Sequence, residues 1–198
     1  MPEEEVPFSQ LPDIYKALDF LGIRRAETTV CETDDIVAAY ALHYGEALEV
    51  VVSSFDSDFF QLITDKVSVL RYRGDKSILC TPSFVREKFG VEPCQYADFK
   101  SLVGDNADNV KGIKGIGVKT AASLLQRFGT LDSLLERSEE IEKPSVRKAI
   151  EEGREKVLLN RRLIALCGCA DLPFALSELA YLYKGERTGD VLSAIGVK

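Results

Sequence analysis

Apolar residues recur at helical spacing near the start of the chain. One face of the helix predicted over 11–21 carries Leu11, Ile14, Leu18 and Leu21. A second helix is predicted from an N-cap at Thr33 to Gly45, because Asp34 and Asp35 then occupy its electropositive first turn. Its expected buried stripe consists of Ile36, Val37, Tyr40, Ala41 and Tyr44.

Short β-branched runs predict strands after these helices. Residues 48–52, LEVVV, are typical of a buried parallel strand. Further strands are predicted over 67–72 and 78–80. Helices that alternate with strands indicate an α/β fold, here a partial parallel sheet with flanking helices and right-handed crossovers.

From Thr81 onward the pattern is helical. Thr81 and Pro82 suit the N-cap and first position of a helix that Gly90 ends. Further helices are expected over 93–103, up to Phe128, from Thr130 and over 144–166, with a glycine-rich hairpin at 104–117. We therefore expect an α/β part over 1–80, a helical part over 81–174 and a C-terminal tail over 175–198.

Composition narrows the class of protein. The 198 residues are 45% hydrophobic and 29% charged, as in ordinary globular proteins, and no apolar run nears the roughly 18 residues of a membrane span. With no signal-like start and five cysteines without a CxxC pair, a reducing, cytoplasmic location is expected. The single histidine argues against a zinc site. The net charge of −7 argues mildly against a nucleic-acid binder, but carboxylates of a metal site lower the net charge as well.

Three groups of acidic residues are the candidates for metal binding and catalysis. They are CETDD with Glu32, Asp34 and Asp35, FDSD with Asp56 and Asp58, and GDNADN with Asp105 and Asp108. Each alone has an ordinary structural explanation as a helix start or a turn. If the fold brings them together, their repulsion requires a divalent cation, and oxygen ligands suit Mg²⁺ or Mn²⁺. A pair of such ions is the apparatus of phosphodiester hydrolysis.

A basic hairpin follows the third acidic group. Residues 109–131 contain no acid, and GIKGIGVKTA precedes a helix in the pattern of a helix-hairpin-helix. Glycines allow a phosphate to approach the backbone, and a helix start offers free N–H groups. Packing alone is the alternative explanation for the glycines. The candidate DNA contacts are Gly112, Lys114, Gly115, Gly117, Lys119 and Thr120.

In order and spacing, the three acidic blocks resemble those of the 5′–3′ exonuclease and flap endonuclease family, over about residues 7–174. LVGDNADNVKGIKGIGVKTA, which joins the third block to the helix-three-turn-helix, is the most specific part. The resemblance implies a PIN-like nuclease core that cuts 5′ ends and 5′ flaps of DNA with two metal ions, in replication and repair. It also implies a potassium ion at the carbonyls of 112–117, a DNA polymerase as partner, and a monomer without membrane attachment.

The resemblance implies roles for the acids as well. Glu32, Asp34 and Asp35 would be catalytic and serve the first metal, while Asp56, Asp58, Asp105 and Asp108 would complete the second. These seven carboxylates form the expected metal-ligand set.

Two departures from the family pattern qualify this expectation. The family's N-terminal aspartate-bearing strand and basic arch have no counterpart here, so we expect a weakened sheet, fewer ligands for the first metal and feeble cutting. Phe55 and Ser57 replace a usual glycine and lysine, with loss of backbone freedom and of a positive charge. A branched-DNA-binding relative that cuts poorly, or a fragment without independent function, therefore remains the alternative to an active nuclease.

Overall fold

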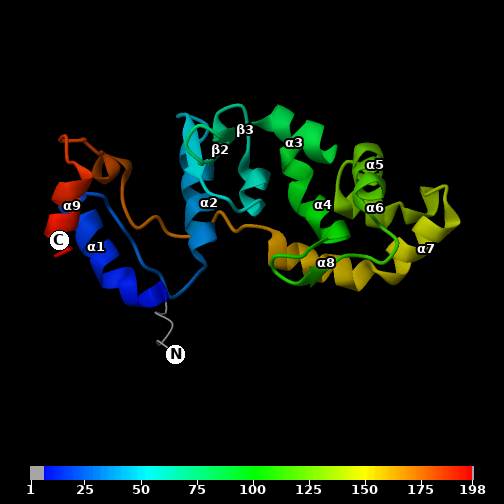
Figure 1. Ribbon diagram of the computed structural model, residues 1–198. Coiled ribbons are helices and arrows are strands. Elements are labelled where there is room, and N and C mark those ends of the chain that lie inside the picture. The colour runs from blue at the N-terminus through cyan, green and yellow to red at the C-terminus, as the bar shows by residue number, and fades with distance from the viewer. Residues whose placement is uncertain (1–6, 198) are drawn as a thin grey trace. The chain divides into compact units, whose positions relative to one another are not determined.

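The computed structural model describes residues 7–197, which form two compact units (Figure 1). One unit combines the two ends of the chain, up to Val30 and from Asp171 onward. The other unit is continuous and spans Cys31–Ala170. All seven predicted metal ligands and the basic hairpin belong to this second unit.

The first unit is built from two helices. Helix α1 (Leu11–Leu21) has the predicted bounds, and α9 (Thr188–Ala194) packs against it from the other end of the chain. The unit also contains short 3₁₀ turns at Pro7–Gln10 and Leu176–Leu179. No residue of α1 is fully buried, so its apolar face is only half covered within this part of the structure.

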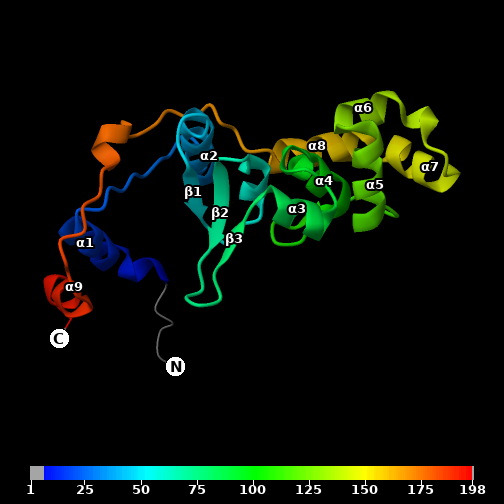
Figure 2. The same ribbon diagram turned by 90° about the horizontal axis from the view of Figure 1, so that it is seen from above.

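The second unit begins with a small mixed sheet in the order β1-β2-β3 (Figure 2). Strand β1 (Val50–Ser53) pairs in parallel with β2 (Val67–Arg71), with Val52 opposite Val69. Strand β3 (Ile78–Cys80) pairs antiparallel with β2. The predicted α/β class is confirmed, with one antiparallel strand beside the parallel pair.

Helix α2 (Thr33–Tyr44) packs on β1 differently from the sequence expectation. Glu32, not Thr33, is the N-cap, and the fully buried residues are Ala38, Ala39 and Ala41. Small side chains let the helix approach the sheet closely, which leaves the larger apolar residues of the predicted stripe at the half-buried edges, apart from Ala41. Gly45 ends the helix as predicted, and a Cβ there would overlap the Ala41 carbonyl and the Val67 side chain.

The rest of this unit is helical. Helix α3 (Pro82–Phe89) starts after Thr81 and ends at Gly90, whose φ of +75° suits glycine. A 3₁₀ turn (Pro93–Gln95) replaces the first turn of the helix predicted over 93–103, so α4 is Tyr96–Val103. The remaining elements are β4 (Gly104–Asp105), β5 (Val110–Lys111), α5 (Val118–Phe128), α6 (Leu131–Glu136), a 3₁₀ turn (Ser138–Glu140), α7 (Pro144–Glu152) and α8 (Arg154–Ile164).

One continuous core joins the sheet to these helices. Phe60, in a 3₁₀ turn after β1 (Asp58–Leu62), is fully buried, and its ring centre lies 5.4 Å from that of Tyr96 in α4. Phe89 of α3 contacts both rings, with its ring centre 5.1 Å from that of Tyr96 and 6.0 Å from that of Phe60. The core therefore fixes the end of β1 relative to α4, and these two elements carry the acidic loops. Within residues 7–197, no helix has the length and apolar character needed to cross a membrane.

Candidate metal centre and nucleic-acid interface

The turn after β1 presents the second acidic group. The Ser54 hydroxyl accepts a hydrogen bond of 3.0 Å from the N–H of Asp56. Asp56 Oδ1 in turn accepts one of 2.8 Å from the N–H of Asp58. Because Phe59 and Phe60 are buried directly after it, the turn is anchored in the core while Asp56 stays exposed.

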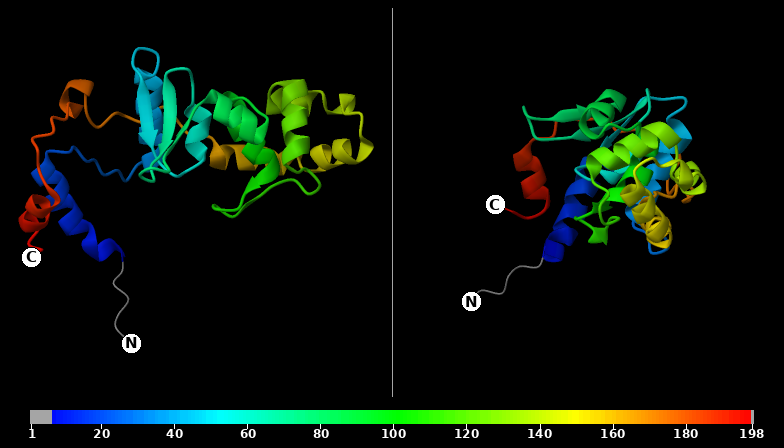
Figure 3. Two further views of the ribbon diagram at one scale, coloured as in Figure 1. Left: turned by 45° about the horizontal axis from the view of Figure 1, so that its top comes forward. Right: turned by 90° about the vertical axis from the view of Figure 1, so that its right-hand side faces the viewer.

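The hairpin after α4 presents the third acidic group (Figure 3). Asp105 lies in β4 and is only 6% exposed, and its Oδ1 accepts a 2.9 Å hydrogen bond from the N–H of Ala107. Asp108 lies in the turn and is exposed. Gly104 and Gly112 cross so closely that a Cβ on Gly112 would overlap backbone atoms of Val103, which explains why glycine is needed there.

The core brings these two groups together. Carboxylate oxygens of Asp58, Asp105 and Asp108 all lie within 4.8 Å of one another. No other such group of three metal-ligating side chains occurs in the described part of the chain. These residues are separated by up to 50 positions in sequence, so the arrangement depends on the packing of the β1 turn against α4.

Lys100 of α4 lies beside this trio. Its ammonium forms an ion pair with Asp105 and lies 3.8 Å from Asp58 Oδ1 and 3.4 Å from Ser57 Oγ. Burial disfavours the ammonium, but the hydrogen bond to Asp105 and the surrounding acids outweigh burial and raise the pKa of Lys100. Lys100 therefore stays charged, and it places a positive charge beside Ser57, where the sequence alone indicated the loss of one.

The trio contains two kinds of carboxyl group. Burial, together with the charges of Asp56, Asp105 and Asp108, raises the pKa of Asp58 to about 6. Burial acts in the same direction on Asp105, but hydrogen bonds from Lys100 and from backbone N–H groups outweigh it and lower the pKa of Asp105. The charge of Asp58 is therefore less well compensated by the protein than that of Asp105.

The first acidic group lies at the start of α2, outside this trio. Burial, followed by the charges of Asp56, Glu32, Asp35 and Asp108, raises the pKa of Asp34. Asp35 Oδ1 accepts a 2.7 Å hydrogen bond from the N–H of Cys167. The three acidic groups thus share one electrostatic environment, although Glu32, Asp34, Asp35 and Asp56 do not join the close trio.

The donor set fits a hard divalent cation. Every candidate ligand is a carboxylate oxygen, which Mg²⁺, Mn²⁺ and Ca²⁺ accept. Asp58 Oδ1 is buried and accepts no hydrogen bond from the protein. Its lone pairs are therefore available to a cation. An uncompensated buried carboxylate oxygen is costly unless a charge neutralises it. Lys100 supplies one positive charge for the trio, and a cation would supply the rest.

The basic hairpin is held by its two isoleucines. Ile113 and Ile116 are buried, whereas Lys114, between them, and Lys119, after them, are exposed. Gly115 has a φ of +88°, which only glycine adopts readily, and Gly117 is the N-cap of α5. The exposed backbone of this turn is consequently accessible to a phosphate.

Two further contacts of the hairpin region were not evident from the sequence. The Lys156 ammonium of α8 donates a 2.8 Å hydrogen bond to the Gly112 carbonyl, one of the carbonyls expected to bind potassium. A hollow of about 330 Å³ opens beside α5. Its lining includes Lys119, Arg127 and Lys143, together with Glu142, which pairs with Arg127 at 3.0 Å. The basic surface therefore extends beyond the hairpin.

Comparison with known proteins matches both parts of the chain. The family described as 5′-3′ exonuclease, N-terminal resolvase-like domain matches residues 1–90, and the 5′-3′ exonuclease, C-terminal SAM fold family matches residues 91–186. The chain belongs to the 5′–3′ exonuclease family. A DNA polymerase I of Thermus filiformis is 39% identical over 183 residues, which cover 92% of this chain and 21% of the relative. The chain spans about a fifth of the length of the curated relatives it matches.

Solved structures show the same fold. A variant of the T5 5′-exonuclease superposes with a TM-score of 0.70 at 24% identity, over 81% of this chain and 65% of that one. A bacteriophage T5 flap endonuclease, in a complex with DNA and metal ions, superposes with a TM-score of 0.69 at 23% identity, over 81% of this chain and 58% of that one. Both similarities confirm the fold expected for an exonuclease of this family.

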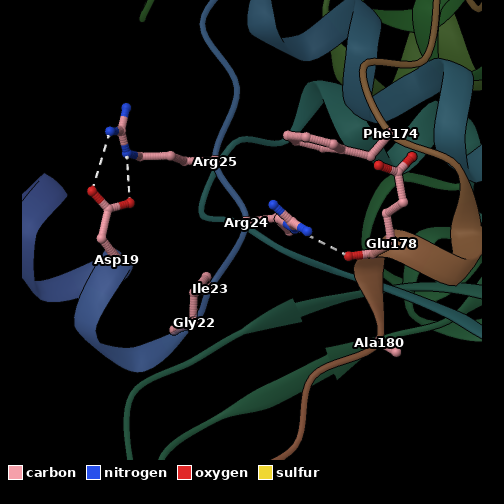
Figure 4. A pocket seen from close by; sticks show the side chains of 8 residues that line it. All are labelled: Asp19, Gly22, Ile23, Arg24, Arg25, Phe174, Glu178 and Ala180. Atoms are coloured by element: carbon pink, nitrogen blue, oxygen red, sulfur yellow. Dashed lines mark hydrogen bonds and ion pairs between the residues drawn. The ribbon is translucent and has the colours of Figure 1, made fainter.

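The first unit of the chain also contains a polar hollow (Figure 4). It encloses about 530 Å³ and is lined by Asp19, Gly22, Ile23, Arg24, Arg25, Phe174, Glu178 and Ala180. Its arginines are already engaged: Arg25 hydrogen-bonds to Asp19 at 3.4 Å, and Arg24 donates to the Glu178 carbonyl at 3.3 Å. None of the predicted site residues lines this hollow.

Sequence reasoning missed two residues that position the acidic loops. Lys100 appears in sequence as one more helix residue, and its place five residues before Asp105 was the available signal. Asn160 of α8 is 4% exposed and donates hydrogen bonds to the carbonyls of Ser101 and Lys111. Phe55, at a position where the family usually has glycine, does not adopt a positive φ, because Asn109 is the one non-glycine residue of the described chain that does.

Proposed function

We propose that this chain is a 5′–3′ exonuclease and 5′-flap endonuclease that hydrolyses DNA phosphodiesters in replication and repair. The observation that carries the proposal is the convergence of Asp58, Asp105 and Asp108 within 4.8 Å, beside a charged and largely buried Lys100. A protein that only packs or binds DNA gains nothing from carboxylates that converge and repel one another. A metal-dependent hydrolase requires them.

The metal ligands we propose are the seven carboxylates of the three acidic groups. Asp56, Asp58, Asp105 and Asp108 would hold one divalent ion, Mg²⁺ or Mn²⁺. Glu32, Asp34 and Asp35 would hold the other ion and act as the catalytic carboxylates. When bound, such ions supply an activated water and stabilise charge on the phosphate. The T5 flap endonuclease that shares this fold was solved with metal ions and DNA, which supports the assignment.

The protein's own cation has a separate role in this proposal. Lys100 compensates Asp105 and part of the charge of Asp58, so the trio is held together before any ion binds. Its position beside Ser57 also puts an ammonium at the end of β1, where a phosphate would approach the carboxylates. We infer that Lys100 positions the ligands and lowers the repulsion between DNA and the acidic site.

The DNA duplex would be gripped by the hairpin of the same compact unit. Gly115 and Gly117 expose backbone, and Gly112 would contribute its carbonyl. Lys114 lies in the turn, and Lys119 and Thr120 lie in the first turn of α5. Such contacts read the phosphate backbone and not the base sequence. A potassium ion at the 112–117 carbonyls would compete with Lys156 for the Gly112 carbonyl. We further propose that the chain acts as a monomer alongside a DNA polymerase, since the Thermus filiformis relative is a DNA polymerase I.

A labelled 5′-flap duplex in Mg²⁺ tests the proposal. The wild type is expected to release the flap, and Asp58→Asn or Asp108→Asn should slow cleavage about 100-fold or more, the usual cost of losing one preorganised charge-stabilising group. Asp65→Asn is the matched control, because Asp65 is an exposed aspartate outside the three acidic groups. Flap binding without any cleavage would instead identify the chain as a non-catalytic DNA-binding relative.

A further inference from the structure

Phe55 is an aromatic side chain placed directly before the acidic turn. It follows β1, precedes Asp56 in the chain, and its residue surface is 52% exposed. The neighbouring phenylalanines, Phe59 and Phe60, are buried, so the core does not require a third ring at this place. Single exposed apolar side chains are common on protein surfaces, so the contacts of Phe55 and its place beside the carboxylates carry the argument.

Two arginines hold Phe55 in place, Arg71 at the end of β2 and Arg73 in the turn that follows. The Arg71 guanidinium donates a 2.9 Å hydrogen bond from Nη2 to the Phe55 carbonyl and lies 4.8 Å above the buried ring of Phe60. The Arg73 guanidinium lies 5.0 Å from the centre of the Phe55 ring, within the range of a cation–π contact. The ring is therefore supported from the sheet while about half of its residue surface stays accessible.

A long turn connects β2 to β3 (Figure 2), and it carries a net positive charge. Residues 71–77 carry Arg71, Arg73 and Lys76 against one acid, Asp75, a formal net charge of +2. The turn is closed by Ser77, whose hydroxyl accepts a 2.8 Å hydrogen bond from the N–H of Arg73 and donates one of 2.6 Å to the Gly74 carbonyl. A strand of DNA that places a phosphate at the acidic site thus has compensating positive charge alongside it.

We propose that Phe55 and Arg73 form a stacking platform for one unpaired nucleobase of the DNA strand being cut. The base stacks on the accessible surface of the Phe55 ring, and Arg73 supports the ring and contacts an adjacent phosphate. Every base has a π-face, so the platform binds any of the four bases and requires only that a base is present and unpaired. Since Phe55 adjoins Asp56, the stacked base belongs to a nucleotide next to the scissile phosphate. The inference rests on the proposed nuclease function and deepens it.

Flap DNAs with a single abasic position test the platform. Affinities are measured by fluorescence anisotropy with Ca²⁺ in place of Mg²⁺, with the abasic position moved through the nucleotides around the junction. The wild type should lose about 5- to 100-fold in affinity at one position, the usual range for base–aromatic stacking. Phe55→Leu keeps apolar volume without a π-face, so it should bind intact flap more weakly by a similar factor and be insensitive to that abasic position.

Two variants serve as controls. Phe55→Tyr retains the ring and should behave as the wild type does. Ile78→Ala removes a side chain of comparable exposure, 48%, from strand β3. This variant should bind intact flap DNA and abasic flap DNA as tightly as the wild type does. The platform is wrong if Phe55→Leu binds intact flap as tightly as the wild type, or keeps the full abasic penalty. Cleavage by the wild type in Mg²⁺ separates that failure from a failure of the nuclease function, in which no flap is cut by any variant.

Discussion

The side-chain amide of Asn160 donates a 3.0 Å hydrogen bond to the carbonyl of Lys111 and so joins α8 to the end of the acidic hairpin. The same amide donates at 2.9 Å to the carbonyl of Ser101 in α4. A single buried side chain from α8 therefore fixes the two segments that flank Asp105. Helix α8 carries none of the predicted ligands, yet it positions the proposed metal site.

Asn160→Leu is expected to destabilise the fold. It leaves the carbonyls of Ser101 and Lys111 without this donor in a buried place, and each such loss costs about 1–3 kcal/mol. Urea denaturation of the metal-free protein measures the free energy of unfolding. Arg162→Leu, at an exposed position of the same helix, should stay within about 0.5 kcal/mol of the wild type. Equal stability of Asn160→Leu and the wild type would contradict this role of the amide.

Lys100→Met and Asp58→Asn should shift metal-dependent stability in opposite directions. Without metal, Lys100→Met leaves Asp58 and Asp105 uncompensated and should unfold more easily, by about 3 kcal/mol, as when a buried ion pair loses a partner. Asp58→Asn removes a buried, repelled charge and should be as stable as the wild type or more so. The change in Tm on adding Mn²⁺ should therefore be largest for Lys100→Met and smallest for Asp58→Asn. The reverse order would argue against a cation at the trio.

Lys114→Glu combined with Lys119→Glu should weaken binding to duplex DNA of any sequence. Each phosphate contact contributes about one unit to the slope of log K against log salt, so the slope should fall by about two. Filter binding over a salt series measures it. Lys16→Glu with Lys184→Glu gives the same change of net charge outside the hairpin and should leave the slope unchanged. A steep, unaltered slope in the hairpin variant would show that DNA binds elsewhere.

Two aspartates that share Arg161 should give opposite dependences of stability on pH. Burial raises the pKa of Asp98, although the N–H of Leu131 and Arg161 oppose this, so folded Asp98 binds its proton more tightly than unfolded Asp98. Its contribution to stability should therefore fall as pH rises through the ordinary aspartate pKa of about 4 to the folded pKa. The hydrogen bond from Arg161 lowers the pKa of Asp132, so its contribution is present above about pH 4 and lost as pH falls through its folded pKa.

Unfolding free energies of Asp98→Asn and Asp132→Asn, measured against the wild type from pH 3 to 7, check these signs. The stability of the wild type relative to Asp98→Asn should decrease with rising pH, and relative to Asp132→Asn it should increase. Parallel pH curves for all three proteins would mean that neither carboxyl group is perturbed by folding.

The sequence by itself determined the local elements and the family. Thr81, Pro82 and Gly90 bound α3, Gly129 ends α5, and the spacing in 11–21 predicts α1, because caps and periodicity act over one or two turns. The three acidic groups and the glycine-rich hairpin were also readable as motifs. The family that they resemble is the one to which the chain belongs.

Only the tertiary structure decided which carboxylates meet and what balances them. Asp58, Asp105 and Asp108 converge because the turn after β1 packs on α4, and Lys100 lies among them because that face of α4 is the one the core buries. The burial of the small residues of α2 depends likewise on the segments that pack against this helix, and the pairing of α1 with α9 joins the two ends of the chain. Periodicity tells which residues share a helix face, but the closeness of two faces is set by side-chain volumes from distant segments.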